Sequence, residues 1–240
     1  MPFPLPFLPT LRMPGVRELP PFAGPFAHWR ARIAMALALG LGAAAHAQAT
    51  PPAAAAATAG LSGEAQQVAR WIRSTQNNQR LPYLLIDKHA ARVHVFDAAG
   101  TLQASSAVLL GLARGDHSVP GIGERLMSAI APHERTTPAG RFLSEPGQNL
   151  QGEDIVWIDY DAAVSLHRVR TANAADRRLQ RLASATVADN RISYGCVNVP
   201  AHFYDRHIAP VWGKRPGVVY VLPETQPAAA LFGFSAAGTR

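Results

Sequence analysis

The chain has 240 residues, of which 48% are hydrophobic and 16% charged, and its formal net charge is +7. This size and balance predict one globular domain with unstructured extensions. The sequence contains no dense Lys/Arg stripe with interleaved aromatic residues, so it indicates no binding of nucleic acid. A single cysteine, Cys196, excludes an internal disulfide.

The N-terminal segment predicts export. Arg30 and Arg32 precede an uncharged run from Ile33 to Ala45, and Ala45-His46-Ala47 supplies the small residues that signal peptidase requires. We therefore expect residues 1–47 to be an N-terminal extension with a signal peptide, cleaved after Ala47, and the product to be periplasmic. The apolar run is shorter than the about 20 residues of a spanning helix, so no stable membrane span is expected after cleavage. An uncleaved anchor is the alternative.

The charge of the exported form is modest. Removing residues 1–47 takes away four arginines and one glutamate and leaves a net charge of about +4. A basic protein suits an anionic wall polymer, although this balance is also common on proteins with other partners. Residues 1–27, rich in proline and phenylalanine, fit neither a charged leader nor a folded element, and we hypothesise that translation starts nearer Met13.

The segments before the main domain have distinct compositions. Residues 48–61 are rich in Ala, Pro and Thr and predict a flexible linker. An N-terminal helix is expected within residues 62–80. Ser62 is a suitable N-cap, and four apolar side chains then recur on one helix face, Ala65, Val68, Trp71 and Ile72.

The pattern from residue 81 to 223 predicts a strand-rich domain. Short apolar and β-branched runs predict strands at residues 83–87, 92–97, 101–112, 140–143, 155–159, 163–167 and 218–222, with a long irregular loop over 116–138. Helices are expected after an Asn173 cap, over 173–184, and over 200–208. The fold class is therefore β-dominated α+β, and the Ala/Gly-rich residues 224–240 are expected to be a disordered tail.

Cys196 is the first candidate for chemistry. In an oxidising compartment a lone cysteine is a buried inert thiol, an intermolecular link or a reactive group. Gly195 permits a sharp turn that brings consecutive N–H groups toward whatever bonds to the sulfur, as in an oxyanion hole. A thiol nucleophile also needs a basic partner, and His167, at the end of an apolar strand, is the best candidate. A buried structural thiol and a structural histidine are the alternatives to this interpretation.

A family resemblance adds to this interpretation. Ser193-Tyr194-Gly195-Cys196-Val197-Asn198 resembles the Ser/Thr-His-Gly-Cys-x-x signature of L,D-transpeptidase (YkuD-type) catalytic domains. Three other segments follow in that family's order: the strand pair 84–87 and 93–96, Thr137-Pro138-Ala139-Gly140-Arg141-Phe142, and Val164-Ser165-Leu166-His167. The match covers about residues 81–223. It implies a β-sandwich-like catalytic domain that acts on peptidoglycan stem peptides without a cofactor.

The resemblance also implies roles for residues. Cys196 would be the nucleophile and His167 the base, oriented by a backbone carbonyl near Arg168. The N–H groups of Tyr194, Gly195 and Cys196 would form the oxyanion hole. Further candidates for orienting the base or binding substrate are Arg168, Arg191, Ser193 and Asn198, with Arg191 holding a substrate carboxylate or simply solvated.

Two departures from the family pattern stand out. Tyr194 occupies the position of the signature histidine, and about a dozen extra residues separate His167 from Cys196. The alternatives to a transpeptidase are therefore a cysteine hydrolase of L,D-carboxypeptidase type and a catalytically weakened peptidoglycan-binding module.

No metal site is expected, because His202 and His207 are five residues apart on the expected helix and point in different directions.

Overall fold

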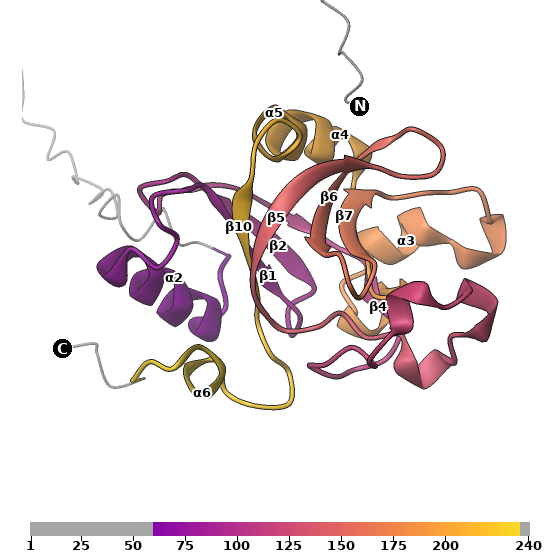
Figure 1. The fold of residues 1–240 in the computed structure, drawn as a ribbon, viewed down its shortest axis with the longest axis horizontal. Helices are drawn as coiled ribbons and strands as arrows, with labels where there is room; N and C mark the ends of the chain where they lie inside the picture. Colours follow the sequence, from indigo (N-terminus) through magenta and orange to yellow (C-terminus); the bar gives the residue numbers. More distant parts are fainter. Residues whose placement is uncertain (1–59, 236–240) are drawn as a thin grey trace, which may run out of the picture. The chain divides into compact units, whose positions relative to one another are not determined.

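The computed structural model describes residues 60–235 (Figure 1), and the predicted signal peptide and nearly all of the linker lie outside the described residues. The described chain is mostly sheet with a few short helices, so the β-dominated α+β class is confirmed. No helix in this part of the chain has both the length and the hydrophobicity needed to cross a bilayer.

Residues 60–235 contain five α-helices and ten strands. The helices are α2 (Gly63–Thr75), α3 (Arg178–Ala183), α4 (Ala201–Phe203), α5 (Ala209–Trp212) and α6 (Ala228–Phe232), with a π-helical turn, Tyr204–Ile208, between α4 and α5. The strands are β1 (Tyr83–Asp87), β2 (Arg92–Phe96), β3 (Leu102–Ala107), β4 (Leu110–Gly111), β5 (Gly140–Gln148), β6 (Asp154–Asp159), β7 (Val164–Arg168), β8 (Arg191–Ser193), β9 (Val197–Val199) and β10 (Gly217–Val221).

Eight strands form one mixed sheet in the order β3-β2-β1-β10-β5-β6-β7-β9, and β4 pairs with β8. β5 joins the two halves, because residues 140–144 pair with β10 and residues 145–148 pair with β6. A strand shared in this way turns the sheet back over itself, as in sandwich corners. Side chains from both ends of the sheet consequently meet in one core, including Val93 of β2 and Val199 of β9.

The central strands are buried on both faces. Leu84 and Ile86 of β1 face the core between the two halves of the sheet, where the α4–α5 segment also packs. Tyr83 and Leu85 point to the opposite face, which α2 and α6 cover (Figure 1). This alternation follows from the period of two along a strand. It explains why β1 has no polar face in the sequence.

The N-terminal helix begins as predicted. The Ser62 side chain accepts a hydrogen bond from the Ala65 N–H at 3.1 Å, and Ala65, Val68 and Ile72 are buried. Trp71 stacks on the rings of Phe232 and Phe234.

The predicted disordered tail is wrong over residues 224–235. Phe232 and Phe234 pack against α2, and the Glu224 carboxylate is buried against Arg191, 2.6 Å from its guanidinium. Aromatic stacking and an ion pair with distant partners order a segment whose composition alone suggests fraying.

Three more sequence predictions need correction. The predicted strand 101–112 is broken into β3 and β4, which belong to different sheets. β5 continues five residues past Leu143, although Pro146 and Gly147 lie in it, because it moves from β10 to β6 there. The helix expected after Asn173 begins at Arg178, because Asn173 caps a separate 3₁₀ turn.

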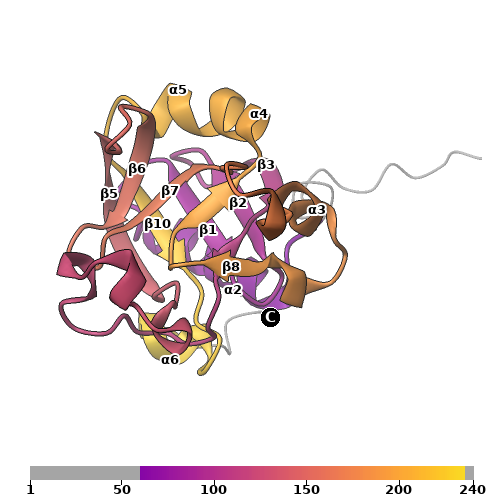
Figure 2. The ribbon, with the colours of Figure 1, turned by 90° about the vertical axis from the view of Figure 1, so that its right-hand side faces the viewer.

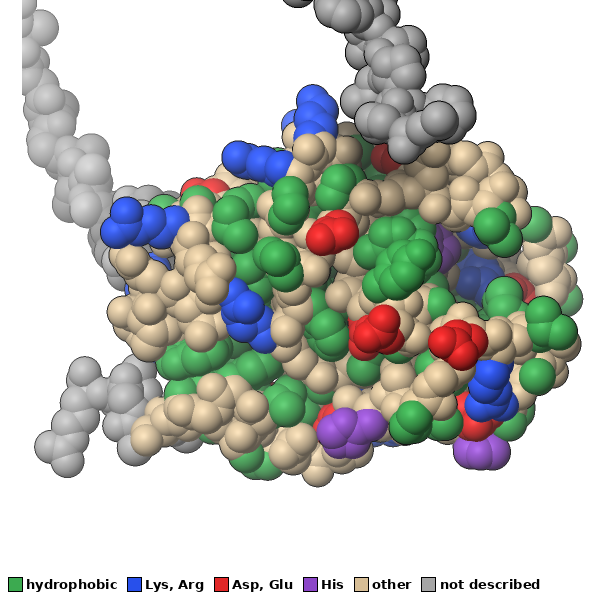
Figure 3. Space-filling view, viewed as in Figure 1, with side chains coloured by type: hydrophobic (Ala, Val, Ile, Leu, Met, Phe, Trp, Pro, Cys, Tyr) green, Lys and Arg blue, Asp and Glu red, His purple; other side chains and the backbone are tan. Residues whose placement is uncertain are grey.

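The segment between β4 and β5 is irregular, as predicted, with 3₁₀ turns at Ile122–Glu124, Met127–Ala129 and Pro132–Glu134. On the face drawn in Figure 3, hydrophobic side chains are interspersed with charged and polar ones. The α3 region lies beside β8 in the turned view of Figure 2. These two segments, 112–139 and 169–190, flank the site described next.

Candidate active site

The pairing of β7 with β9 brings the candidate residues together. The two strands are parallel, with Leu166 opposite Val197 and His167 opposite Asn198. Leu166 and Val197 are fully buried in the core. Because side chains alternate along strands, Ser165, His167 and Asn198 emerge on the other face of the sheet, as does Cys196 just before β9.

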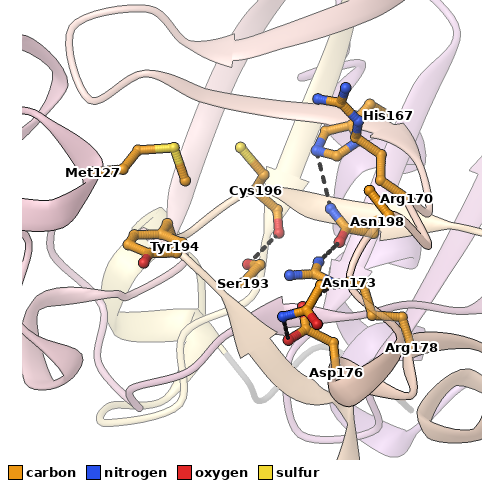
Figure 4. A pocket seen from close by; sticks show the side chains of 11 residues that line it. Met127, His167, Arg170, Asn173, Asp176, Arg178, Ser193, Tyr194, Cys196 and Asn198 are labelled. Carbon is orange, nitrogen blue, oxygen red and sulfur yellow. Dashed lines mark hydrogen bonds and ion pairs between the residues drawn. The ribbon is translucent and has the colours of Figure 1, made fainter.

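The Cys196 sulfur points into a pocket (Figure 4). The side chain is half-buried, and its Sγ atom lies 3.6 Å from Ser165 Oγ and 3.7 Å from the Ala163 carbonyl oxygen. The sulfur is therefore accessible from one side, and is neither sealed in apolar packing nor bonded in a disulfide.

Gly195 makes the turn before Cys196 possible. Its φ is +132°, and a Cβ at this position would lie 2.7 Å from the Thr136 carbonyl oxygen. Its own carbonyl accepts a hydrogen bond from Thr137 Oγ1 at 2.8 Å. Only glycine fits this backbone conformation and this close approach. The 136–137 segment thus fixes the turn that carries Cys196.

The three predicted oxyanion donors differ in whether they already have a hydrogen-bond acceptor. The Gly195 N–H already donates to Ser193 Oγ at 3.1 Å, and the Ser193 hydroxyl donates to the Cys196 carbonyl at 2.6 Å. Within residues 60–235, the N–H groups of Tyr194 and Cys196 have no hydrogen-bond acceptor. The predicted role of the Gly195 amide is therefore corrected. Two main-chain donors remain for an oxyanion, because the Ser193 hydroxyl takes the third.

His167 has defined contacts at both ring nitrogens. Nδ1 lies 2.8 Å from the Arg168 carbonyl oxygen, so Nδ1 carries a proton. Nε2 lies 3.1 Å from Asn198 Nδ2 (Figure 4). In the neutral ring Nε2 is then the acceptor, and it is the nitrogen on the side of the pocket that holds Cys196.

The imidazole and the thiol shift each other's protonation. Burial raises the pKa of the Cys196 thiol, but the neighbouring His167 ring and the Ser165 hydrogen bonds outweigh burial and hold that pKa below its ordinary value. Burial lowers the pKa of His167, but the interaction with Cys196 outweighs it and raises that pKa above its ordinary value. Both shifts favour a thiolate beside an imidazolium, the reactive form of a cysteine nucleophile.

The pocket has a volume of about 380 Å³, a size that suits a small ligand or peptide end. Its walls come from four parts of the chain: β7 and β9, the turn 193–196 between β8 and β9, the 3₁₀ turn with Met127, and the segment after β7. Two arginines of that segment, Arg170 and Arg178, line the pocket. The extra residues between His167 and Cys196 thus form one wall of the site.

Two sequence candidates lie away from the pocket. Arg191 is buried, with 7% of its surface exposed, and pairs with Glu224, so a substrate carboxylate cannot reach it there. The Arg168 side chain pairs with Asp154 and Asp205. Only the Arg168 carbonyl faces the site, where it contacts the His167 ring.

Three contributors to the site were missed from the sequence. Ser165 contacts the sulfur, Thr137 holds the Gly195 carbonyl, and Arg178 contacts Asn198. Ser165 could have been found, because it lies two residues before His167 and so on the same strand face.

Tyr194 lines the pocket, and its ring packs under the Arg135 guanidinium at 3.9 Å. Within the described part of the chain, no group of three or more His, Cys, Asp or Glu residues could hold a metal ion.

The sequence matches no family model and no curated protein. Solved structures are similar to parts of the chain. The helical cell shape determining protein Pgp2 from Campylobacter jejuni is 14% identical, over 61% of this chain and 49% of that chain, with a TM-score of 0.40. The catalytic domain of an E. faecium L,D-transpeptidase is 16% identical, over 59% of this chain and 96% of that chain, with a TM-score of 0.33.

L,D-transpeptidase 1 from Mycobacterium tuberculosis is 12% identical, over 59% of this chain and 61% of that chain, with a TM-score of 0.33. The chain thus spans about half of the length of the Pgp2 chain and about three fifths of that of the mycobacterial enzyme.

Proposed function

We propose that this chain is a peptidoglycan L,D-transpeptidase, a cysteine acyltransferase with Cys196 as nucleophile and His167 as base. The observation that supports this most is the position of the thiol and the imidazole on one face of two neighbouring parallel strands, at an open pocket. The resemblance of residues 193–198 to the L,D-transpeptidase signature supplies the reaction. The whole proposal requires no cofactor.

The first half of the reaction forms an acyl-enzyme. The Cys196 thiolate attacks the carbonyl after the L-centre of meso-diaminopimelate in a tetrapeptide stem, forming an S–C bond. The N–H groups of Tyr194 and Cys196 stabilise the negative oxygen. The C–N bond to the terminal D-alanine then breaks, and the His167 imidazolium gives its proton to the leaving amine. The product is a thioester and free D-alanine.

The second half transfers the acyl group. An acceptor amine, on another stem or another molecule, attacks the thioester, and His167 takes its proton. The C–S bond breaks and the Cys196 thiolate is restored. Water in place of the amine would give a carboxypeptidase instead. The tetrapeptide stems of the wall are the partner, and the predicted export places the chain in the periplasm with them.

The test is an incubation of purified protein with disaccharide-tetrapeptide, followed by intact mass spectrometry and product analysis. We expect a covalent adduct on Cys196 with the mass of the substrate less D-alanine, and cross-linked dimer as product. Cys196→Ala removes the nucleophile and should give neither.

The other outcomes separate the alternatives. Adduct with free tripeptide and no dimer would show a hydrolase. Binding without an adduct in both wild type and Cys196→Ala would show a wall-binding module, and would contradict the proposed enzyme. Cys196→Ser is a useful further variant, because it keeps an oxygen nucleophile at the same position but lacks the acidity of a thiol.

A further inference from the structure

Arg178 reaches the site from the extra segment between His167 and Cys196. It lies at the start of α3, and one of its Nη atoms is 2.9 Å from Asn198 Oδ1. Its Nε donates to Asp176 at 2.8 Å, which fixes the guanidinium. Asp176 in turn is held by Asn173 at 2.9 Å. The short helix and the turn before it thus hold one cation against the side chain beside the base (Figure 4).

The Arg178 contact fixes which end of the Asn198 amide faces His167. Arginine has donors only, so the atom that it contacts is the amide oxygen. The amide nitrogen then faces His167 Nε2, at 3.1 Å. Asn198 is 1% exposed, so no water competes for these bonds in the way that it does at a surface.

An N–H donor at Nε2 has a defined effect on the ring. The Arg168 carbonyl already requires a proton on Nδ1, so the amide donor pairs with a neutral ring whose Nε2 is free of hydrogen. An imidazolium would carry hydrogen on both nitrogens, and its Nε2–H would meet the Asn198 N–H₂ group. Hydrogen bonding to one form of an acid favours that form.

We propose that Arg178 is a positioning residue of the site: it holds the Asn198 amide in one orientation, and so favours the neutral form of His167, which accepts the thiol proton. The ring then experiences two opposed influences, the Cys196 thiolate that favours imidazolium and the Asn198 donor that favours the neutral ring. Arg170, which leads out of the same strand, adds a positive charge that also favours the neutral ring. The catalytic importance of Arg178 rests on the proposed function.

The experiment measures the protonation of His167 directly, without activity. In a Cys196→Ala background, which removes the thiolate, His167 is titrated by NMR of its ring and assigned by comparison with His167→Gln. Arg178→Met removes both charge and donor. The freed amide can rotate and present its oxygen to Nε2–H, and we expect the pKa of His167 to rise by on the order of one unit.

A matched variant separates the hydrogen bond from the charge. Arg178→Gln is close to methionine in size and equally uncharged, but it retains a donor for Asn198 Oδ1, and it should keep the pKa near the parent value. Arg177→Met removes a charge from the adjacent, exposed position and should also leave it near the parent value.

An unchanged pKa in Arg178→Met, or equal rises in the Met and Gln variants, would overturn the proposal. Melting curves of all variants check that the fold is retained. If Arg178→Met fails to fold, Arg178→Leu, which also lacks a charge and a donor, is compared with Arg178→Gln in its place. A wild type that forms no adduct with tetrapeptide would refute the proposed function and leave this titration unaffected.

Discussion

The position of Cys196 depends on single residues whose identity the backbone dictates. Gly195 has a φ that other residues rarely adopt, and the Thr136 carbonyl leaves no room for a Cβ. Ser193 connects both sides of the turn, through the Gly195 N–H and the Cys196 carbonyl. The fold itself therefore determines the direction of the Cys196 side chain, which is the preorganisation that the proposed main-chain oxyanion site requires.

Gly195→Ala should lower both the stability of the fold and the reactivity of the Cys196 thiol. The positive φ alone costs about 1–3 kcal/mol, and the 2.7 Å approach to Thr136 adds steric conflict. We expect a lower free energy of unfolding in urea titrations and slower alkylation of Cys196. Gly121→Ala is the control, because Gly121 has a φ of +71° but a Cβ there would meet no atom within 4 Å. If the two variants lose the same stability and the same alkylation rate, the close approach of position 195 to the Thr136 carbonyl is unimportant.

Among the secondary-structure elements, a buried ionic cluster joins the parts that frame the site. Lys88, which follows β1, donates to Asp116 at 2.8 Å and to the Thr137 carbonyl at 2.9 Å, and its side chain is fully buried. Arg191 of β8 and Glu224 complete the cluster. The cluster thereby ties the 112–139 segment, the strand before Cys196 and the C-terminal segment to the sheet.

Lys88→Met should destabilise the protein by about 3–5 kcal/mol at pH 7, because it leaves the buried Asp116 carboxylate without its cation. Burial alone would raise the pKa of Asp116, but its hydrogen bonds from Lys88 and Thr225 hold that pKa well below its usual range. This contribution is present above the unfolded pKa of about 3.9 and is lost as the pH falls through the folded value. The difference in the free energy of unfolding between Lys88→Met and wild type should therefore become smaller below about pH 4.

Urea titrations at pH 7 and pH 3 measure this difference. The control is Arg125→Met, which breaks the ion pair with Glu134 outside the cluster and should change stability little. A Lys88→Met variant as stable as wild type at pH 7 would contradict a structural role for the cluster.

Across the molecule as a whole, the described domain does not end at residue 223. Glu224 pairs with Arg191 across the fold, and α6 covers the same face of the sheet as α2. A truncation after Pro223 should therefore lower the melting temperature strongly, since it strips Arg191 and Lys88 of a buried partner. Glu224→Gln keeps α6 and should recover part of the loss. If the truncated chain has the same melting temperature as the full-length protein, the domain ends at residue 223, as the composition predicted.

The sequence predicted the elements better than their contacts. Strands such as β1 and β10 are continuous apolar runs, and Ser62 caps its helix locally, so both could be recognised from neighbouring residues. The exchange of β5 between two partners could not, because it depends on strands far away in the sequence.

The same limit applies to the site. Cys196 and His167 could be singled out by chemistry, and Gly195 by its place before the thiol. The ion pair that removes Arg191 from the pocket involves Glu224, which is 33 residues further on. Likewise, Arg178 contacts Asn198 only because the extra segment folds back onto β9, and no local pattern marks it.

Activation of Cys196 by His167 underlies the whole proposed mechanism, and the pH dependence of Cys196 alkylation probes it without any substrate. The chain has one cysteine, so iodoacetamide adds once and intact mass gives the rate at each pH. We expect a midpoint below the about 8.5 of a free thiol in wild type, and a midpoint shifted upward in His167→Ala but not in the exposed control His202→Ala. The same midpoint in wild type and His167→Ala would mean that the imidazole does not activate the thiol.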